Sequence, residues 1–105
     1  MSVKEVKTIE EFNEVIATNK IVAVDMWAAW CGPCRQYSPV FEKVSETTEN
    51  IAFVKVNVDE VNEIAAEYNV VSIPTTLIIK DGKVSNRIIG SVSPSVLRNE
   101  LSKFE

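Results

Sequence analysis

The sequence of 105 residues contains no histidine, only two cysteines and only three glycines. A structural zinc site normally takes four cysteine or histidine ligands, so one chain cannot complete such a site, and a metal shared between two copies is the alternative that remains. Three glycines and no Gly-x-Gly-x-x-Gly motif argue against a phosphate-binding loop, so we expect no bound nicotinamide or flavin cofactor.

Positive charge and long apolar runs are also scarce. Fifteen acidic residues outnumber eleven basic ones, which gives a net charge of −4 and argues against nucleic acid or an anionic membrane as a partner. The N-terminal residues 1–5 lack the apolar core of a signal peptide, and no apolar run approaches membrane-spanning length. At this length and with 46% hydrophobic residues, we expect one globular domain over 1–105, located in the cytoplasm.

Both cysteines lie in one pentapeptide, Trp30-Cys31-Gly32-Pro33-Cys34. A disulfide across so short a loop restricts the unfolded chain little, so a purely structural bridge is the weaker interpretation. At a helix start, unpaired backbone N–H groups and the helix dipole lower the pKa of a thiol, and this effect favours Cys31 as a nucleophile. Gly32 permits close approach of another chain, and Pro33 suits an early helical position. The pair therefore predicts dithiol redox chemistry.

Apolar residues alternate between helical and strand spacing along the chain. Thr8 followed by Glu11 predicts a capping box, Asp81-Gly82 a two-residue hairpin turn, and Ser93-Pro94 the start of the last helix. The expected elements are an N-terminal strand, a helix from Thr8 to about Asn19, a strand over 21–26, a helix through 37–44, a strand over 52–58, a helix over 61–68, strands over 75–80 and 83–89, and a C-terminal helix. This βαβαβαββα order predicts an α/β fold with a central mixed sheet and helices on both faces.

The chain resembles the thioredoxin family over nearly its whole length. The residues that carry the resemblance are 24–28, Trp30 to Cys34, Pro39, 55–59, Ile73-Pro74-Thr75, Asp81-Gly82 and Gly90. A C-x-x-C motif alone is common, but this pentapeptide together with the later Ile-Pro-Thr is specific. The resemblance implies the thioredoxin fold and a general protein-disulfide reductase that supports redox homeostasis.

The resemblance also implies roles for the site residues. Cys31 would attack a substrate disulfide, and Cys34 would resolve the mixed disulfide that forms. Asp25 would lie beneath Cys34 and exchange its proton, because burial in an apolar strand should raise the pKa of this carboxyl toward neutrality. The alternative is a structural acid whose counter-charge is Lys55, which lies in another central strand.

A substrate platform follows from the same resemblance. It implies a cis bond between Ile73 and Pro74 across from the cysteines, where the backbone of Ile73 pairs with an extended substrate segment. On residues alone, Pro74 could simply begin a strand. The platform consists of Trp30, Gly32, Pro33, Ile73, Pro74 and Gly90. Trp27 is expected to pack beside the site.

The implied partners are disulfide-containing proteins and a thioredoxin reductase, through which NADPH acts indirectly, and the protein is expected to be a monomer. A thiol oxidase or isomerase and a scaffold protein with incidental cysteines stay open as alternatives. Some positions depart from common family patterns and bear on partner choice. They are Met26, Arg35, 36–38, Ser72 and Ser91.

Overall fold

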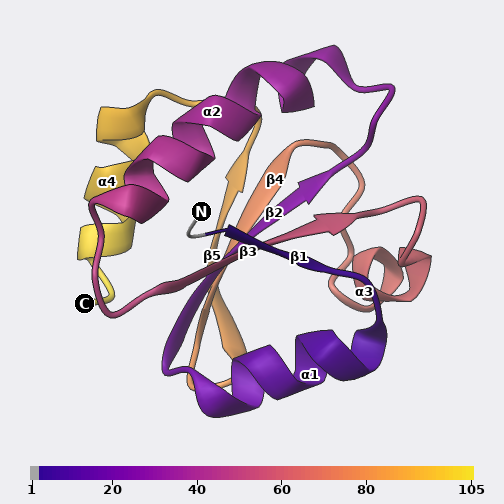
Figure 1. Ribbon diagram of the computed structural model, residues 1–105, viewed down its shortest axis with the longest axis horizontal. Helices are drawn as coiled ribbons and strands as arrows, with labels where there is room; N and C mark the ends of the chain where they lie inside the picture. The colour runs from indigo at the N-terminus through magenta and orange to yellow at the C-terminus, as the bar shows by residue number, and fades with distance from the viewer. Residues whose placement is uncertain (1–2) are drawn as a thin grey trace.

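A five-stranded sheet with two helices on each face forms the structure, a computed structural model that describes residues 3–105 (Figure 1). The elements are β1 (Val3–Val6), α1 (Ile9–Thr18), β2 (Ile21–Trp27), α2 (Gly32–Glu46), β3 (Ala52–Asn57), α3 (Asn62–Glu67), β4 (Thr75–Lys80), β5 (Lys83–Ile89) and α4 (Pro94–Ser102). The order βαβαβαββα and the mixed sheet predicted from the sequence are confirmed.

Strand β2 occupies the centre of the sheet, whose strand order is β1-β3-β2-β4-β5. It pairs in parallel with β3 and antiparallel with β4, while β1 and β5 form the two edges. Parallel neighbours need a crossover connection, and here α1 and α2 supply the crossovers. The carboxyl end of the central strand therefore leads directly to the cysteine loop and α2.

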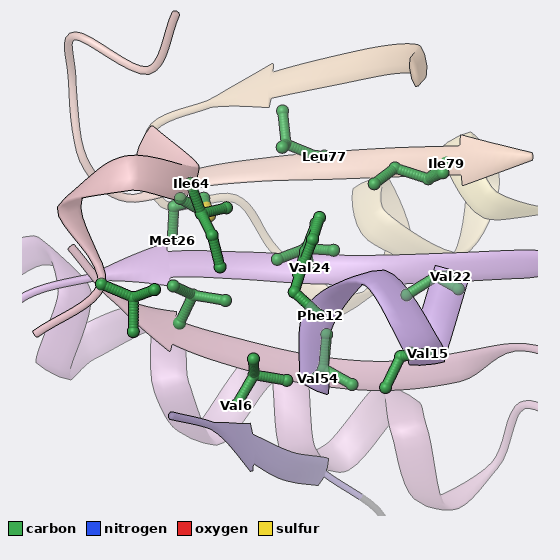
Figure 2. Close-up of a cluster of buried hydrophobic side chains, with 12 residues drawn as sticks. Val6, Phe12, Val15, Val22, Val24, Met26, Val54, Ile64, Leu77 and Ile79 are labelled. Atoms are coloured by element: carbon green, nitrogen blue, oxygen red, sulfur yellow. The ribbon is translucent and has the colours of Figure 1, made fainter. Parts of the chain in front are cut away.

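Alternate side chains of β2 supply two separate apolar clusters. Val22, Val24 and Met26 pack with Phe12 of α1 and Ile64 of α3 on one face (Figure 2). The opposite face is covered by α2 and α4 and contains Ile21, Ala23, Tyr37, Phe41, Val44, Leu97 and Leu101. Because side chains alternate along a strand, Asp25 lies on this second face, beneath α2.

Local signals explain the starts of α1 and α4. The Thr8 hydroxyl accepts from the Glu11 N–H at 3.1 Å, as a capping box requires, but the Glu11 carboxylate accepts from the Lys7 N–H at 3.1 Å rather than from Thr8. The Ser93 hydroxyl accepts from the Val96 N–H at 3.3 Å at the start of α4.

The β4–β5 hairpin turns at the dipeptide that the sequence predicted. Asp81 and Gly82 have φ angles of 52° and 81°, the pair of positive values that a two-residue turn of the I′ kind needs. The hairpin sets β4 beside the central strand and carries Ile89 and Gly90 to the edge of the cysteine loop.

Candidate active site

The cysteine pair lies at the first turn of α2. Cys31 is the N-cap residue of the helix, and its Sγ accepts from the Cys34 backbone N–H at 3.2 Å. The two residues form a disulfide with their Cα atoms 5.2 Å apart, and both side chains are buried. After reduction, the same N–H group and the helix dipole would stabilise negative charge on Cys31, which is the condition for a nucleophilic thiolate.

The loop before β4 faces the disulfide from the other side. The Ile73–Pro74 bond is cis, as the resemblance implied, and the Ile73 carbonyl oxygen lies 3.7 Å from the Cys31 Sγ. The Gly90 N–H donates to the Pro74 carbonyl oxygen at 2.8 Å, so the residue that follows β5 joins the same loop. Ile73 thus joins the loop before β4 to Cys31, and Pro74 joins the same loop to Gly90.

Trp30 directly precedes Cys31 and is 69% exposed. Its indole Nε1–H donates to the Asp59 carboxylate at 2.9 Å, which fixes the ring in place. Gly32 and Pro33 are also exposed, whereas Pro74 is buried. Of the platform residues, Trp30, Gly32 and Pro33 are therefore the ones that are open to solvent beside Cys31.

Asp25 lies in the interior, only 2% exposed. Burial raises the pKa of its carboxyl to about 7, although the Lys55 ammonium lowers this pKa and the Glu5 carboxylate raises it. Its Oδ1 atom is buried and has no hydrogen-bond partner within the described chain. A carboxyl with this pKa can take or give a proton near neutral pH.

A cavity of about 100 Å³ connects Asp25 with the second cysteine. This volume exceeds the roughly 30 Å³ that one water occupies, and the walls are partly polar, so water can carry a proton across it. The lining residues are Asp25, Trp27, Cys34, Arg35, Ser38 and Lys55.

Lys55 does not form an ion pair with Asp25 within residues 3–105. Its Nζ lies 3.7 Å from the Glu5 Oε1 and 5.3 Å from the centre of the Trp27 ring. Asp25 is therefore not held in a direct ion pair among the described residues, and Lys55 acts on it through space by lowering the pKa of its carboxyl. Trp27 lies beside the site, as expected.

Sequence reasoning missed two residues that contact the site. Asp59 belongs to the segment 55–59 that carries the family resemblance, but nothing in its neighbouring residues indicates that it would hold Trp30. The sequence does not indicate that Glu5 lies beside Lys55, because the register between parallel strands is set through long connections.

The described part of the chain contains no cluster of three or more histidine, cysteine, aspartate or glutamate side chains placed to hold a metal ion. None of its helices has both the length and the apolar character needed to cross a membrane.

Comparison with known proteins gives one consistent result. The family model described as Thioredoxin matches residues 3–103. A thioredoxin of Pyropia yezoensis is 46% identical over 99% of this chain and 98% of the relative, and one of Mycoplasmoides gallisepticum is 41% identical over 93% and 98%. The solved structure of Plasmodium falciparum thioredoxin superimposes with a TM-score of 0.92 at 36% identity and covers 97% of this chain and 99% of that one.

Proposed function

This chain belongs to the thioredoxin family, and from that premise we propose how its residues divide the work of disulfide reduction. The protein has the thioredoxin fold and is a thiol-disulfide oxidoreductase with protein-disulfide reductase activity. We assign the attacking sulfur to Cys31 and the resolving sulfur to Cys34. The observation that carries this assignment is the position of Cys31 as the N-cap of α2, with Cys34 one turn further in.

In the first step, the Cys31 thiolate attacks one sulfur of a partner disulfide. A bond forms between Cys31 Sγ and that sulfur, while the second partner sulfur leaves as a thiolate and takes up a proton. The N–H groups and dipole at the helix start favour the Cys31 thiolate, and Gly32 and Pro33 leave room for the incoming backbone.

In the second step, Cys34 attacks Cys31 Sγ and displaces the remaining partner sulfur. Cys34 is 2% exposed and must first lose its proton, which we assign to the Asp25 carboxylate across the shared cavity. The products are a reduced partner and the Cys31–Cys34 disulfide, so two electrons pass to the partner. Lys55 supports this step because its positive charge lowers the pKa of Asp25.

We assign partner binding to the platform. Trp30, Ile73 and Gly90 would contact an extended segment beside its disulfide, and the Ile73 carbonyl oxygen already lies 3.7 Å from Cys31 Sγ. Backbone pairing binds many sequences because it does not read side chains, which suits a general reductase.

The remaining proposals concern the cellular setting. The oxidised pair would be restored by a thioredoxin reductase that draws electrons from NADPH, with no cofactor bound by this chain. We propose that residues 1–105 form one domain, that the protein acts as a monomer, and that it works in the cytoplasm, where a reducing environment favours catalytic over structural cysteines.

The reduction potential of the Cys31–Cys34 couple tests the direction of the reaction. Equilibration with a glutathione buffer should give about −270 mV, the value known for thioredoxins rather than one obtained from this chain. A value of about −180 mV or higher would instead indicate an oxidase or isomerase.

A double variant, Cys31→Ser with Cys34→Ser, tests whether the cysteines are needed at all. Serine keeps an N-cap oxygen at position 31, so the fold should persist while disulfide reduction is lost. Full retention of the cellular role would support a scaffold and overturn the reductase assignment.

A further inference from the structure

Three charged side chains lie in one row across three neighbouring strands. Glu5 of β1 is in register with Lys55 of β3, and Lys55 is in register with Asp25 of β2. Neighbouring strands lie about 4.8 Å apart, so the ammonium is placed between two carboxyl groups on the same face of the sheet. Lys55 can therefore approach either carboxyl group.

The structure places Lys55 with Glu5. The Nζ–Oε1 separation is 3.7 Å, and the two side chains are only 28% and 25% exposed, which weakens screening by solvent. The Trp27 ring also faces this ammonium. Glu5 Oε2 and Asp25 Oδ1 are both buried without hydrogen-bond partners in the described chain, so each carboxyl is poorly compensated. The Lys55 ammonium is thus the cation in the row for both carboxyl groups, and it contacts that of Glu5.

The other titratable groups that face Asp25 are neutral or held in place by hydrogen bonds. Lys55 is therefore the charge whose position can change the pKa of Asp25. The Tyr37 hydroxyl of α2 is hydrogen-bonded to Thr76 of β4 at 2.7 Å, and burial raises the pKa of Tyr37 to about 12, so it stays neutral. The Arg35 guanidinium donates to the Ala29 carbonyl oxygen at 2.8 Å and is tied to the loop. Cys34, the remaining titratable neighbour, carries no proton in the disulfide.

We propose that Glu5 is a positioning residue that holds the Lys55 ammonium on the outer side of the row and thereby sets the pH at which Asp25 exchanges its proton. The proposal deepens the assigned function, because it rests on Asp25 as the proton acceptor for Cys34. Lys55 favours an ionised Asp25, and Glu5 opposes this effect by binding Lys55 and by adding its own negative charge. Asp25 then keeps its proton to a higher pH than it would beside an unpaired lysine.

Replacing Glu5 by glutamine removes the charge with little change of shape. Lys55 then has Asp25 as its remaining acidic neighbour in the row, and the direct repulsion from Glu5 disappears. Both changes favour the carboxylate, so the titration midpoint of Asp25 should fall by about half a pH unit or more. The pH dependence of mixed-disulfide resolution should move in the same direction, which raises the resolution rate about threefold on the acid side.

The first experiment follows the Asp25 carboxyl carbon by NMR from pH 4 to pH 10 in the oxidised protein. Glu5→Gln should lower the midpoint, whereas Glu14→Gln, the same charge change on the exposed side of α1, should leave it in place. An unchanged midpoint in Glu5→Gln, or an equal shift in both variants, would overturn the proposal. Because this titration uses no substrate, its result is independent of whether the protein reduces disulfides.

Lys55→Gln provides a second test, because it separates the effect of Glu5 that passes through Lys55 from the direct repulsion between Glu5 and Asp25. Loss of the ammonium should raise the Asp25 midpoint, and adding Glu5→Gln in that background should lower it by less than in the natural chain. An equal effect of Glu5→Gln in both backgrounds would mean that Glu5 acts only through direct repulsion, and the positioning role would be rejected. If the titrations agree but wild-type resolution shows no dependence on Asp25, the assigned proton transfer fails instead.

Discussion

At the scale of the residue, Asp25 is almost completely buried, and one oxygen of its carboxyl group has no hydrogen-bond partner in the described chain. Its pKa rises from 3.8 to about 7, chiefly through loss of hydration. The native state therefore keeps a proton that the unfolded chain releases between these pH values. The resulting stabilisation is complete below the unfolded pKa and is lost as the pH rises through 7.

We therefore predict that Asp25→Asn changes the pH dependence of stability. The free energy of unfolding of the variant minus that of the natural chain should be about 2–3 kcal/mol larger at pH 8 than at pH 5. The reason is that the amide never ionises, whereas the buried carboxyl does. Urea titrations of the oxidised proteins at both pH values measure the difference. Asp81→Asn, in the exposed hairpin turn, is the control and should show no such dependence. An equal effect of Asp25→Asn at both pH values would contradict the raised pKa.

Asp25→Ala should separate the two chemical steps. Without a proton acceptor near Cys34, resolution of the mixed disulfide slows at pH 7, by about tenfold or more if the carboxylate acts as a general base. The initial attack by Cys31 should change little. Single-turnover quenching with a disulfide peptide reports both rates, and equal slowing of the two would indicate a packing defect instead.

At the scale of the element, helix starts position the chemistry as well as stabilise the fold. Cys31 occupies the N-cap position of α2, which serine or threonine occupies in α4 and α1. The backbone N–H that would otherwise need a hydroxyl partner at this cap instead contacts a sulfur. The end of the helix that is structurally weakest is thus the end where an anionic sulfur is most favoured.

The cap of α1 offers a stability test with no connection to the chemistry. Thr8→Ala removes the acceptor for the Glu11 N–H and should lower the free energy of unfolding by about 1 kcal/mol. Thr18→Ala, at the other end of the same helix, should cost less because alanine favours the helical state. Chemical denaturation of both variants gives the comparison, and equal losses would show that the cap contributes nothing specific.

At the scale of the whole molecule, the two apolar clusters share one sheet and should unfold together. Ile64 packs in the cluster under α1 and α3, and Ile78 packs in the cluster under α2 and α4. Either isoleucine→valine change should cost about 1 kcal/mol, and the double variant should cost their sum within about 0.5 kcal/mol. Tryptophan fluorescence and far-ultraviolet circular dichroism should give coincident unfolding curves. Separate curves would mean that the two sides of the sheet melt independently.

Much of the fold was predictable because its signals are local. The Asp81-Gly82 turn, the Ser93 cap and the apolar periods each depend on a few adjacent residues, and the element order follows from them. The ends of α3 shifted by one residue from the expected 61–68, which is ordinary fraying of a short helix.

The site was predictable only in part. The cysteines and Asp25 could be found because they break their local patterns. Asp59 and Glu5 could not, since they reach the site through tertiary contacts that span 29 residues for Asp59 and a parallel register for Glu5. One of the two hydrogen bonds of the predicted capping box does not form. The Glu11 carboxylate could accept from the N–H of Thr8 or from that of Lys7, and it accepts from Lys7.

The central position of β2 determines which parts of the protein can open to solvent without global unfolding. Backbone amides in the middle of a sheet exchange with solvent only when the whole molecule opens, whereas loops at its edge open locally. Asp25 lies in this central strand, while the Ile73–Pro74 and Gly90 segments lie in connections outside the strands. We therefore expect these connecting segments to open locally more readily than β2, so that such an opening leaves the strand that holds Asp25 paired.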